Sequence, residues 1–236
     1  MWKYMMAFIG CILLLQGCVS SISGEPQKQE KEREIMNEGL NKQLLQAAKR
    51  GEADTLSKLI KNGADINAQD SRGRTAIMNA TYSNDVETAK ILIKKGANVN
   101  IQDDIKNSPF LYAGAEGYLD ILELTIKAGA DPTITNRYGG TALIPASEHG
   151  YVDVINVLLT QTDIDVNHIN NLGWTALLEA IILNNGDKKQ QQTVQLLIEH
   201  GANVNIPDND NVTPLQHARE KGFKEIEKIL LKAGAI

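Results

Sequence analysis

The sequence predicts an all-α solenoid of about six helix-turn-helix units joined by short β-turn loops, and two periodic features carry this prediction. The first is a Gly-Ala pair that begins at Gly63, Gly96, Gly129, Gly201 and Gly234, with one pair missing between the third and the fourth. The second is a Ser or Thr that opens an apolar stretch, at Thr75, Ser108, Thr141, Thr175 and Thr213. Both features share a period of about 33 residues, which is typical of stacked repeats.

Each unit contains the signals of two short helices. Thr75 is a natural N-cap for a helix over 75–83, because its hydroxyl can accept a hydrogen bond from the first turn. Apolar residues at near-helical spacing predict a second helix over 86–95. Gly96 ends that helix, because glycine tolerates the left-handed angles of a C-cap. Helices this short are unstable alone in water, so each must bury its apolar side on a neighbouring unit.

The motifs within the period resemble those of ankyrin repeats. That family's pattern includes Thr-Pro-Leu-His and Gly-Ala-Asp-Val-Asn, and this chain has TPLQ at 213–216, GADIN at 63–67 and GANVN at 201–205. The resemblance covers about residues 40–236 and extends to small bacterial ankyrin repeat proteins. We expect the repeat domain to span 38–236. Its units lie near 39–71, 72–105, 106–138, 139–172, 173–210 and 211–236.

The chain departs from the family pattern in three ways. No unit has the fourth-position His, so we expect the His hydrogen bonds between neighbouring loops to be replaced by apolar contact. The first unit lacks its opening motif and the last is rich in Lys and Glu, so both should be capping units with polar outer faces. One residue is inserted near 163–167 and five more within 184–189. The second insertion should form an exposed loop between the paired helices, or an extension of those helices. It is either part of a binding face or the result of neutral drift in a solvated loop.

The first residues predict an export signal. A short start with Lys3 precedes an apolar run of about 11 residues, too short for a bilayer that needs about 20. Residues 15–18, LQGC, resemble the bacterial lipobox, which implies a signal peptide over 1–17 and lipidation of Cys18. The alternative is an ordinary secretory signal with an incidental cysteine. Residues 18–37 are polar and should form a flexible tether, or a frayed leading helix from Gln27 onward.

Composition excludes several functions for the body of the chain. A net charge of −5 argues against nucleic acid, which is bound through many Lys and Arg contacts to phosphates. The chain's cysteines are Cys11 and Cys18, so the body has neither disulfides nor a cysteine metal site. The four histidines show no metal-helix spacing, and no phosphate-binding loop or nucleophile elbow is present. We therefore predict no metal, no cofactor and no enzyme activity.

A ladder of side chains is the first candidate for partner binding. The residue before the recurring Ala of each first helix should stack along the array; these residues are Asn79, Tyr112, Pro145, Glu179 and His217. The resemblance implies that they lie on or near a concave groove where ankyrin partners dock. Tyr82, Tyr112 and Trp174 are possible aromatic anchors, the residue type that dominates binding energy.

A second candidate is a polar pocket around Trp174. Its residues cluster between positions 148 and 179: Glu148, His149, Asn167, His168, Asn170, Trp174 and Glu179. Under the alternative interpretation, Asn and His satisfy the backbone of the loops and Trp174 packs between units. The pocket has a second alternative, a hydrolase that uses Glu148, His168 and Glu179 in a cleft.

These observations predict a monomeric scaffold that binds a protein partner through its concave face. It would be secreted across the cytoplasmic membrane and anchored by lipidated Cys18 to a bacterial membrane, facing the periplasm or the cell surface. A structural component of the cell envelope, with no discrete partner, is a further alternative.

Overall fold

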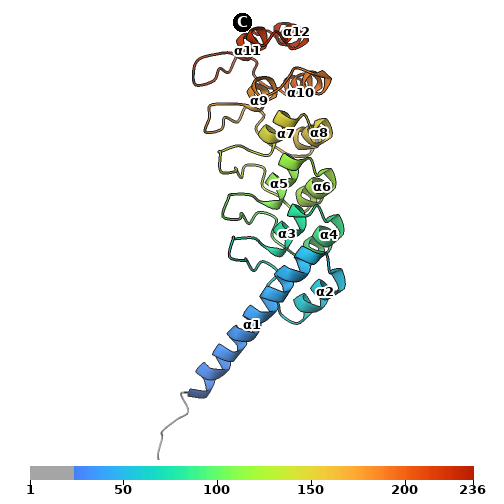
Figure 1. Cartoon of the computed structure of the whole chain (residues 1–236), viewed down its shortest axis with the longest axis vertical. Helices are drawn as coiled ribbons and strands as arrows, with labels where there is room; N and C mark the ends of the chain where they lie inside the picture. Colours follow the sequence, from blue (N-terminus) through green and yellow to red (C-terminus); the bar gives the residue numbers. More distant parts are fainter. Residues whose placement is uncertain (1–23) are drawn as a thin grey trace, which may run out of the picture. The chain divides into compact units, whose positions relative to one another are not determined.

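The computed structural model describes residues 24–236, with side chains from Gln27 onward, and it confirms the all-α solenoid. Within this range there are twelve helices and no strand (Figure 1). They are α1 (Gly24–Arg50), α2 (Ala53–Lys61), α3 (Ala76–Tyr82), α4 (Val86–Lys94), α5 (Pro109–Glu116), α6 (Leu119–Lys127), α7 (Leu143–His149), α8 (Val152–Gln161), α9 (Ala176–Ile182), α10 (Lys188–Glu199), α11 (Pro214–Glu220) and α12 (Lys224–Lys232). None of these helices has the length and apolar character needed to cross a membrane.

The segment between Asn37 and Ile236 is one compact unit made of two layers of helices. First helices contact first helices of the next unit, from α3 through α5, α7 and α9 to α11. Second helices do the same from α2 through α4, α6, α8 and α10 to α12. The loops between units all project on the side of the first helices (Figure 1). Contacts therefore run only between neighbours, as expected of a solenoid.

The core is a set of columns that run through the stack. Two positions after each opening Ser or Thr is a large apolar side chain, and five positions after it is an alanine. The large residues are Ile77, Phe110, Leu143, Leu177 and Leu215, and the alanines are Ala80, Ala113, Ala146, Ala180 and Ala218. All ten are at most 2% exposed. The alanine column lets neighbouring first helices approach closely, while the large residues fill the space between the layers.

Four of the five predicted openings are helix N-caps. The hydroxyls of Thr75, Ser108, Thr175 and Thr213 each accept a hydrogen bond from the backbone N–H three residues on, at 3.2–3.3 Å. Thr141 differs, since α7 starts only at Leu143 and the Thr141 hydroxyl is buried without a partner in the described residues. Pro145 explains this, because proline has no N–H to donate to the Thr141 carbonyl and so delays the start of the helix.

Polar side chains connect neighbouring loops. The expectation that apolar contact replaces the missing His hydrogen bonds is therefore wrong. Asn100 Nδ2 donates to the Gly129 carbonyl at 3.1 Å, and its Oδ1 accepts from Asp131 N at 2.8 Å. Asn167 makes the same pair of bonds to Gly201 and Asn203, at 3.1 and 2.7 Å. Because an amide both donates and accepts, each such Asn satisfies two backbone groups of the next unit.

The start of α1 lies in the segment predicted to form a flexible tether or a frayed leading helix. Residues 24–37 are helical, which agrees with the alternative of a leading helix. Glu, Lys and Gln dominate this stretch and favour helix even when they remain in solvent. The predicted signal peptide and Cys18 lie outside the described residues.

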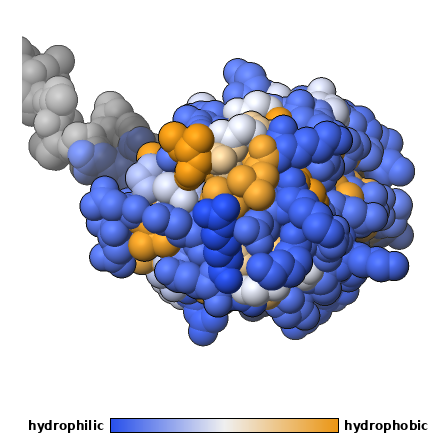
Figure 2. Space-filling model, turned by 90° about the horizontal axis from the view of Figure 1, so that it is seen from above, coloured by the Kyte–Doolittle hydropathy of each residue, from blue (hydrophilic) through white to orange (hydrophobic). Residues whose placement is uncertain are grey.

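The last unit has the polar outer face expected of a cap. Seen from the end that carries α11 and α12, most surface side chains are hydrophilic around a small hydrophobic area (Figure 2). Ion pairs join Arg219 to Glu227 at 2.9 Å and Lys228 to Glu225 at 2.7 Å. The exposed large apolar side chain on α12 is Leu231, at 46%. A polar outer face of this kind is typical of a capping unit.

Candidate functional site

The loops between units share one hydrogen-bonded shape. The first residue of each loop is Asp or Asn, and one of its side-chain oxygens accepts from the backbone N–H groups two and four positions on, at 2.9–3.1 Å. These residues are Asp70, Asp103, Asn136, Asn170 and Asp208. Short polar side chains favour such turns because they replace a backbone acceptor. The loops are thus held in one shape and present equivalent positions at regular spacing.

The third position of three consecutive loops carries an exposed apolar side chain. Ile105, Tyr138 and Leu172 are 40%, 52% and 50% exposed. We call these three residues the loop-tip row. Backbone bonds stack the loops, since Asn171 N donates to the Tyr138 carbonyl at 2.9 Å. Large apolar side chains that recur on adjacent loops form a patch and not isolated exposed residues.

A cavity of about 490 Å³, which we call the central pocket, lies between the loops and the first helices. It is lined by residues of the loops 105–107, 136–140 and 170–174 and by residues of α3, α5, α7 and α9, together with Leu183. Because each wall comes from a different unit, the pocket exists only in the stacked array. Its volume is within the range of ligand-binding clefts, about 300–1,000 Å³.

Four of the predicted binding residues meet in the central pocket. Tyr112, Glu148, Trp174 and Glu179 all line it, together with His149, Asn170 and Pro145. Tyr112, Glu148 and Trp174 are half-buried, while Glu179 is only 5% exposed. Their role in binding a partner stays a prediction.

Asn79, His168 and His217 lie outside the central pocket, and each makes a hydrogen bond within the repeat array. Asn79 is 3% exposed and donates to the Thr75 carbonyl of its own helix at 3.1 Å. His168 Nε2 hydrogen-bonds the Gly139 carbonyl of the preceding loop at 2.6 Å. His217 Nε2 lies 2.7 Å from Asp208 Oδ2. The alternative interpretation, in which Asn and His satisfy the loops, is therefore correct for Asn167, His168 and Asn170.

Two ladder residues hydrogen-bond to the first residue of the loop that precedes them, across the boundary between adjacent units. Asn170 Nδ2 donates to Glu179 Oε1 at 3.1 Å, whereas the carboxylate of Asp208 pairs with His217 of the last unit. An acceptor in the helix thus accompanies an amide in the loop, and a possible donor accompanies a carboxylate. Burial raises the pKa of Asp208, but hydrogen bonds from Val212, His217 and Asp210 outweigh it and leave the pKa lowered.

Glu179 is the unusual acid of the central pocket. Burial, and then the nearby negative charge of Glu148, raise the pKa of Glu179 to about 7, against a smaller lowering by the Asn170 amide. A carboxyl group removed from water is easier to protonate because its charged form loses solvation. Near neutral pH, Glu179 therefore exists in both protonation states.

Aromatic rings form the opposite wall of the central pocket. The rings of Tyr82 and Tyr112 have centroids 4.4 Å apart, and the Arg74 guanidinium lies 4.2 Å from the centre of the Tyr82 ring. The Tyr82 hydroxyl donates to Asp103 Oδ2 at 2.6 Å. Burial and the nearby Glu116 raise the pKa of Tyr112 to about 12. Burial also raises the pKa of Tyr82, so both tyrosine hydroxyls stay neutral across the physiological range.

The comparisons with known proteins agree with the repeat structure. A family model described as ankyrin repeats, in three copies, matches residues 44–136, 110–189 and 164–236. The chain belongs to the ankyrin repeat family. An ankyrin repeat domain from Acinetobacter baumannii AYE, solved by crystallography, is 52% identical, with a TM-score of 0.80 over 82% of this chain and 98% of that one.

Two further ankyrin relatives are similar over different extents. The crystal structure of the ankyrin repeat protein EF0377 is 39% identical, with a TM-score of 0.78 over 81% of this chain and 98% of that chain. The ankyrin repeat protein YahD of Escherichia coli (strain K12) is 56% identical over 78 residues, which is 33% of this chain. That match spans 39% of YahD's length.

The hydrolase alternative loses its geometric support in this ankyrin array. His168 is outside the central pocket, and its Nε2 is bonded to a backbone carbonyl instead of a carboxylate. A general base must lie within hydrogen-bond reach of its partner groups. Among residues 24–236, no group of three or more His, Cys, Asp or Glu side chains is placed to hold a metal ion.

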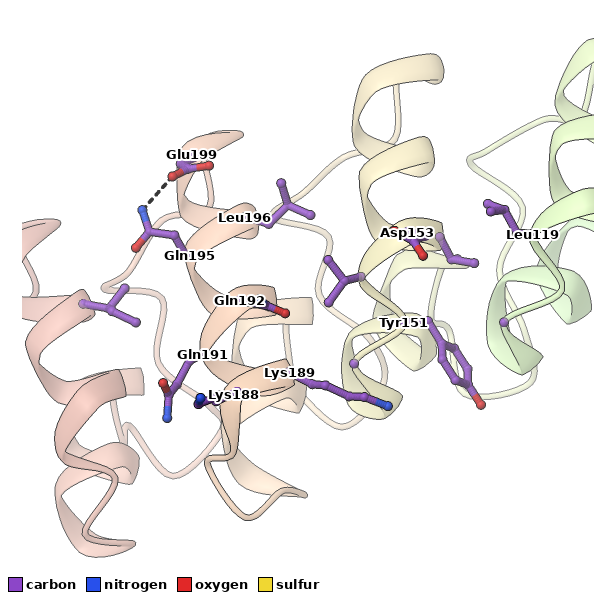
Figure 3. A pocket seen from close by; sticks show the side chains of 15 residues that line it. Leu119, Tyr151, Asp153, Lys188, Lys189, Gln191, Gln192, Gln195, Leu196 and Glu199 are labelled. Carbon is purple, nitrogen blue, oxygen red and sulfur yellow. Dashed lines mark hydrogen bonds between the residues drawn. The ribbon is translucent and has the colours of Figure 1, made fainter.

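The inserted residues of the fifth ankyrin unit both form a loop and extend a helix. The chain leaves α9 at Leu183, and α10 has 12 residues where α4, α6 and α12 have nine. A broad, open groove of about 1020 Å³ runs over the second helices, with Lys189, Gln192 and Tyr151 among its lining residues (Figure 3). The groove presents polar and charged side chains of α10 and contains none of the predicted binding residues.

Proposed function

We propose that this protein is a scaffold that holds a protein partner in the groove between its loops and its first helices. The observation that carries the proposal is the loop-tip row, three exposed apolar side chains that line the central pocket. Ankyrin repeats generally mediate protein–protein interactions, and typically do so without enzyme activity. Exposed apolar patches with polar rims are characteristic of binding surfaces.

A cross-linking capture experiment tests the scaffold function. The full-length chain with a C-terminal tag is cross-linked in bacterial cells beside a Tyr138→Ala/Leu172→Ala variant, and bound proteins are identified by mass spectrometry. We expect the variant to lose roughly ten-fold or more of the captured partner, because central apolar anchors contribute at least about 1 kcal/mol each. Both side chains are exposed, so folding should not change.

The matched control substitutes exposed residues outside the groove. Leu231 and Ile236 are 46% and 89% exposed in the last unit, and Leu231→Ala/Ile236→Ala should capture as much partner as the natural chain. Equal capture by both variants would contradict the groove as the binding face. If the natural chain captures no specific protein, the alternative of a structural envelope component is favoured.

We also propose that Cys18 anchors the protein to the outer side of a bacterial membrane. Supporting this are the apolar run, the LQGC sequence at 15–18 and the polar segment that follows it. A thioether-linked lipid with further acyl chains gives stable anchoring, because two or more chains bind a bilayer far more tightly than one.

Metabolic labelling with a radioactive fatty acid tests the anchor. We expect label in the natural chain and in Cys11→Ser, and none in Cys18→Ser, which should also leave the membrane fraction. Cys11 is the matched control because it is the other cysteine of the chain and lies within the signal. An unmodified mature N-terminus, measured by mass spectrometry, would exclude lipidation.

A further inference from the structure

The central pocket has an excess of negative charge. Glu116, Glu148 and Glu179 line it, and Arg137 is the charged counterpart among its lining residues. Within the described residues, none of the three glutamates forms an ion pair. Arg137 instead lies over the Tyr138 ring at 4.7 Å and donates to its hydroxyl at 3.0 Å. The pocket therefore attracts a cation from outside the chain.

Glu179 adds a buried acceptor to this charge. It is 5% exposed, and within the described residues its side chain accepts one hydrogen bond, from the Asn170 amide to Oε1 at 3.1 Å. A buried carboxylate is normally paired with a cation or with several donors, because desolvation of its charge is costly. Glu179 instead lines an open cavity beside Glu148. In its charged form, Glu179 has no cationic partner within the described residues, and a ligand could supply one.

Aromatic rings border the same space. Tyr112, Tyr138 and Trp174 line the pocket, and two tyrosine rings of the array already carry guanidinium groups, Arg74 over Tyr82 and Arg137 over Tyr138. A cation over a ring is held by the negative potential of the ring face. Carboxylates and aromatic rings that line one pocket match a planar group that carries several N–H donors.

We propose that the central pocket receives an arginine side chain of the protein partner, with Glu148 and Glu179 accepting its N–H groups and the aromatic rings packing on its faces. Arginine fits better than lysine, because its planar fork binds carboxylates and stacks on rings at once. The exposed side chains of the loop-tip row, which line the same pocket, then contact apolar residues that flank the arginine. This inference rests on the proposed scaffold function and specifies its partner.

Peptide titration followed by NMR tests the arginine pocket. The probe is acetyl-Gly-Leu-Arg-Leu-Gly-amide, and its comparison is the same peptide with citrulline, which keeps the shape of arginine and lacks its charge. The full-length chain is observed through the indole N–H signal of Trp174, assigned by its absence in Trp174→Phe. We expect saturable shifts with the arginine peptide, and binding of the citrulline peptide weaker by about ten-fold or more, the size of one charge-assisted contact.

Two variants distinguish binding in the central pocket from nonspecific attraction between opposite charges. Glu148→Gln should weaken the binding of the arginine peptide about five- to ten-fold. Glu220 is an exposed acid on α11 outside the pocket, and Glu220→Gln should leave the affinity for the peptide unchanged. Equal binding of the arginine and citrulline peptides, or unchanged binding to Glu148→Gln, would overturn the proposal. A lysine peptide that binds as tightly as the arginine peptide would overturn the preference for a planar group.

The outcome is independent of the capture experiment. If the loop-tip variants lose a captured protein and the arginine peptide does not bind, the scaffold function stands and the arginine pocket is wrong. If the peptide binds at the pocket and no protein is captured, the pocket recognises the guanidinium group and the scaffold function is wrong.

Discussion

Replacing Glu179 with Gln is expected to stabilise the folded chain at pH 8 by about 2 kcal/mol while leaving its stability at pH 4 nearly unchanged. The folded-state pKa of about 7 lies above the ordinary value of 4.5, so the native state holds this proton more tightly than the unfolded chain does. The stabilising contribution of the protonated acid is fully present below about pH 4.5 and is lost as the pH rises through about 7. Each unit of pKa difference corresponds to about 1.4 kcal/mol, and solvent in the open cavity screens part of the total.

Urea unfolding at pH 4, 6 and 8 measures this effect. Gln keeps an oxygen that can accept the Asn170 amide, so the substitution removes the charge and retains the hydrogen bond. The control is Glu220→Gln on the exposed surface of α11, which should change stability by at most about 0.5 kcal/mol at each pH. If Glu179→Gln has the same pH dependence of stability as the natural chain, the buried acid does not carry the predicted charge penalty.

The period of the sequence predicts the fold well because each unit repeats the same local signals. Thr75 and Ser108 cap helices as their chemistry requires, and the glycines after the second helices, such as Gly96 with φ of 91°, end them. The exception at Thr141 also has a signal in the sequence, because Pro145 lacks the N–H that the other units donate to the capping residue. Local rules fail here only where a specific side chain removes a specific bond.

The candidate site is predictable from the sequence only in part. The stacking of adjacent units brings together Glu148 of the fourth unit with Trp174 and Glu179 of the fifth, and all three line one pocket. Clustering and residue type predict binding roles for His168 and His217, but each is bound to an acceptor of the loops. Exposure and hydrogen-bond partners are properties of the stacked array, so sequence clustering alone does not separate binding residues from loop ties.

The loop-tip row has a signal in the sequence that the periodic motifs alone do not reveal. When the loops are aligned on their first Asp or Asn, the third position reads Arg72, Ile105, Tyr138, Leu172 and Asp210. Large apolar side chains are unexpected at the tip of a polar turn, and three in succession indicate a surface feature. Each of them taken singly looks like ordinary exposed surface.

Replacing Phe110 with Ala is expected to cost about 4 kcal/mol, the largest loss of stability among these predictions. Phe110 is 0% exposed and is the one aromatic residue in a column that otherwise holds Ile and Leu. Truncation removes its transfer free energy and leaves a cavity between the two helix layers. Phe110→Leu should cost only about 1 kcal/mol, because Leu already fills this position in three other units.

The position of Phe110 in the third of six units makes the mode of unfolding informative. Units contact only their neighbours, so a weakened third unit should uncouple the units before it from those after it. In a Trp2→Phe background, Trp174 is the sole tryptophan and its fluorescence reports the fifth unit, whereas circular dichroism reports all helices. We expect Phe110→Ala to lower the urea midpoint measured by circular dichroism more than the midpoint measured by fluorescence. If both midpoints fall by the same amount, the array unfolds as one cooperative body, and the coupling across the stack exceeds the cost of the cavity.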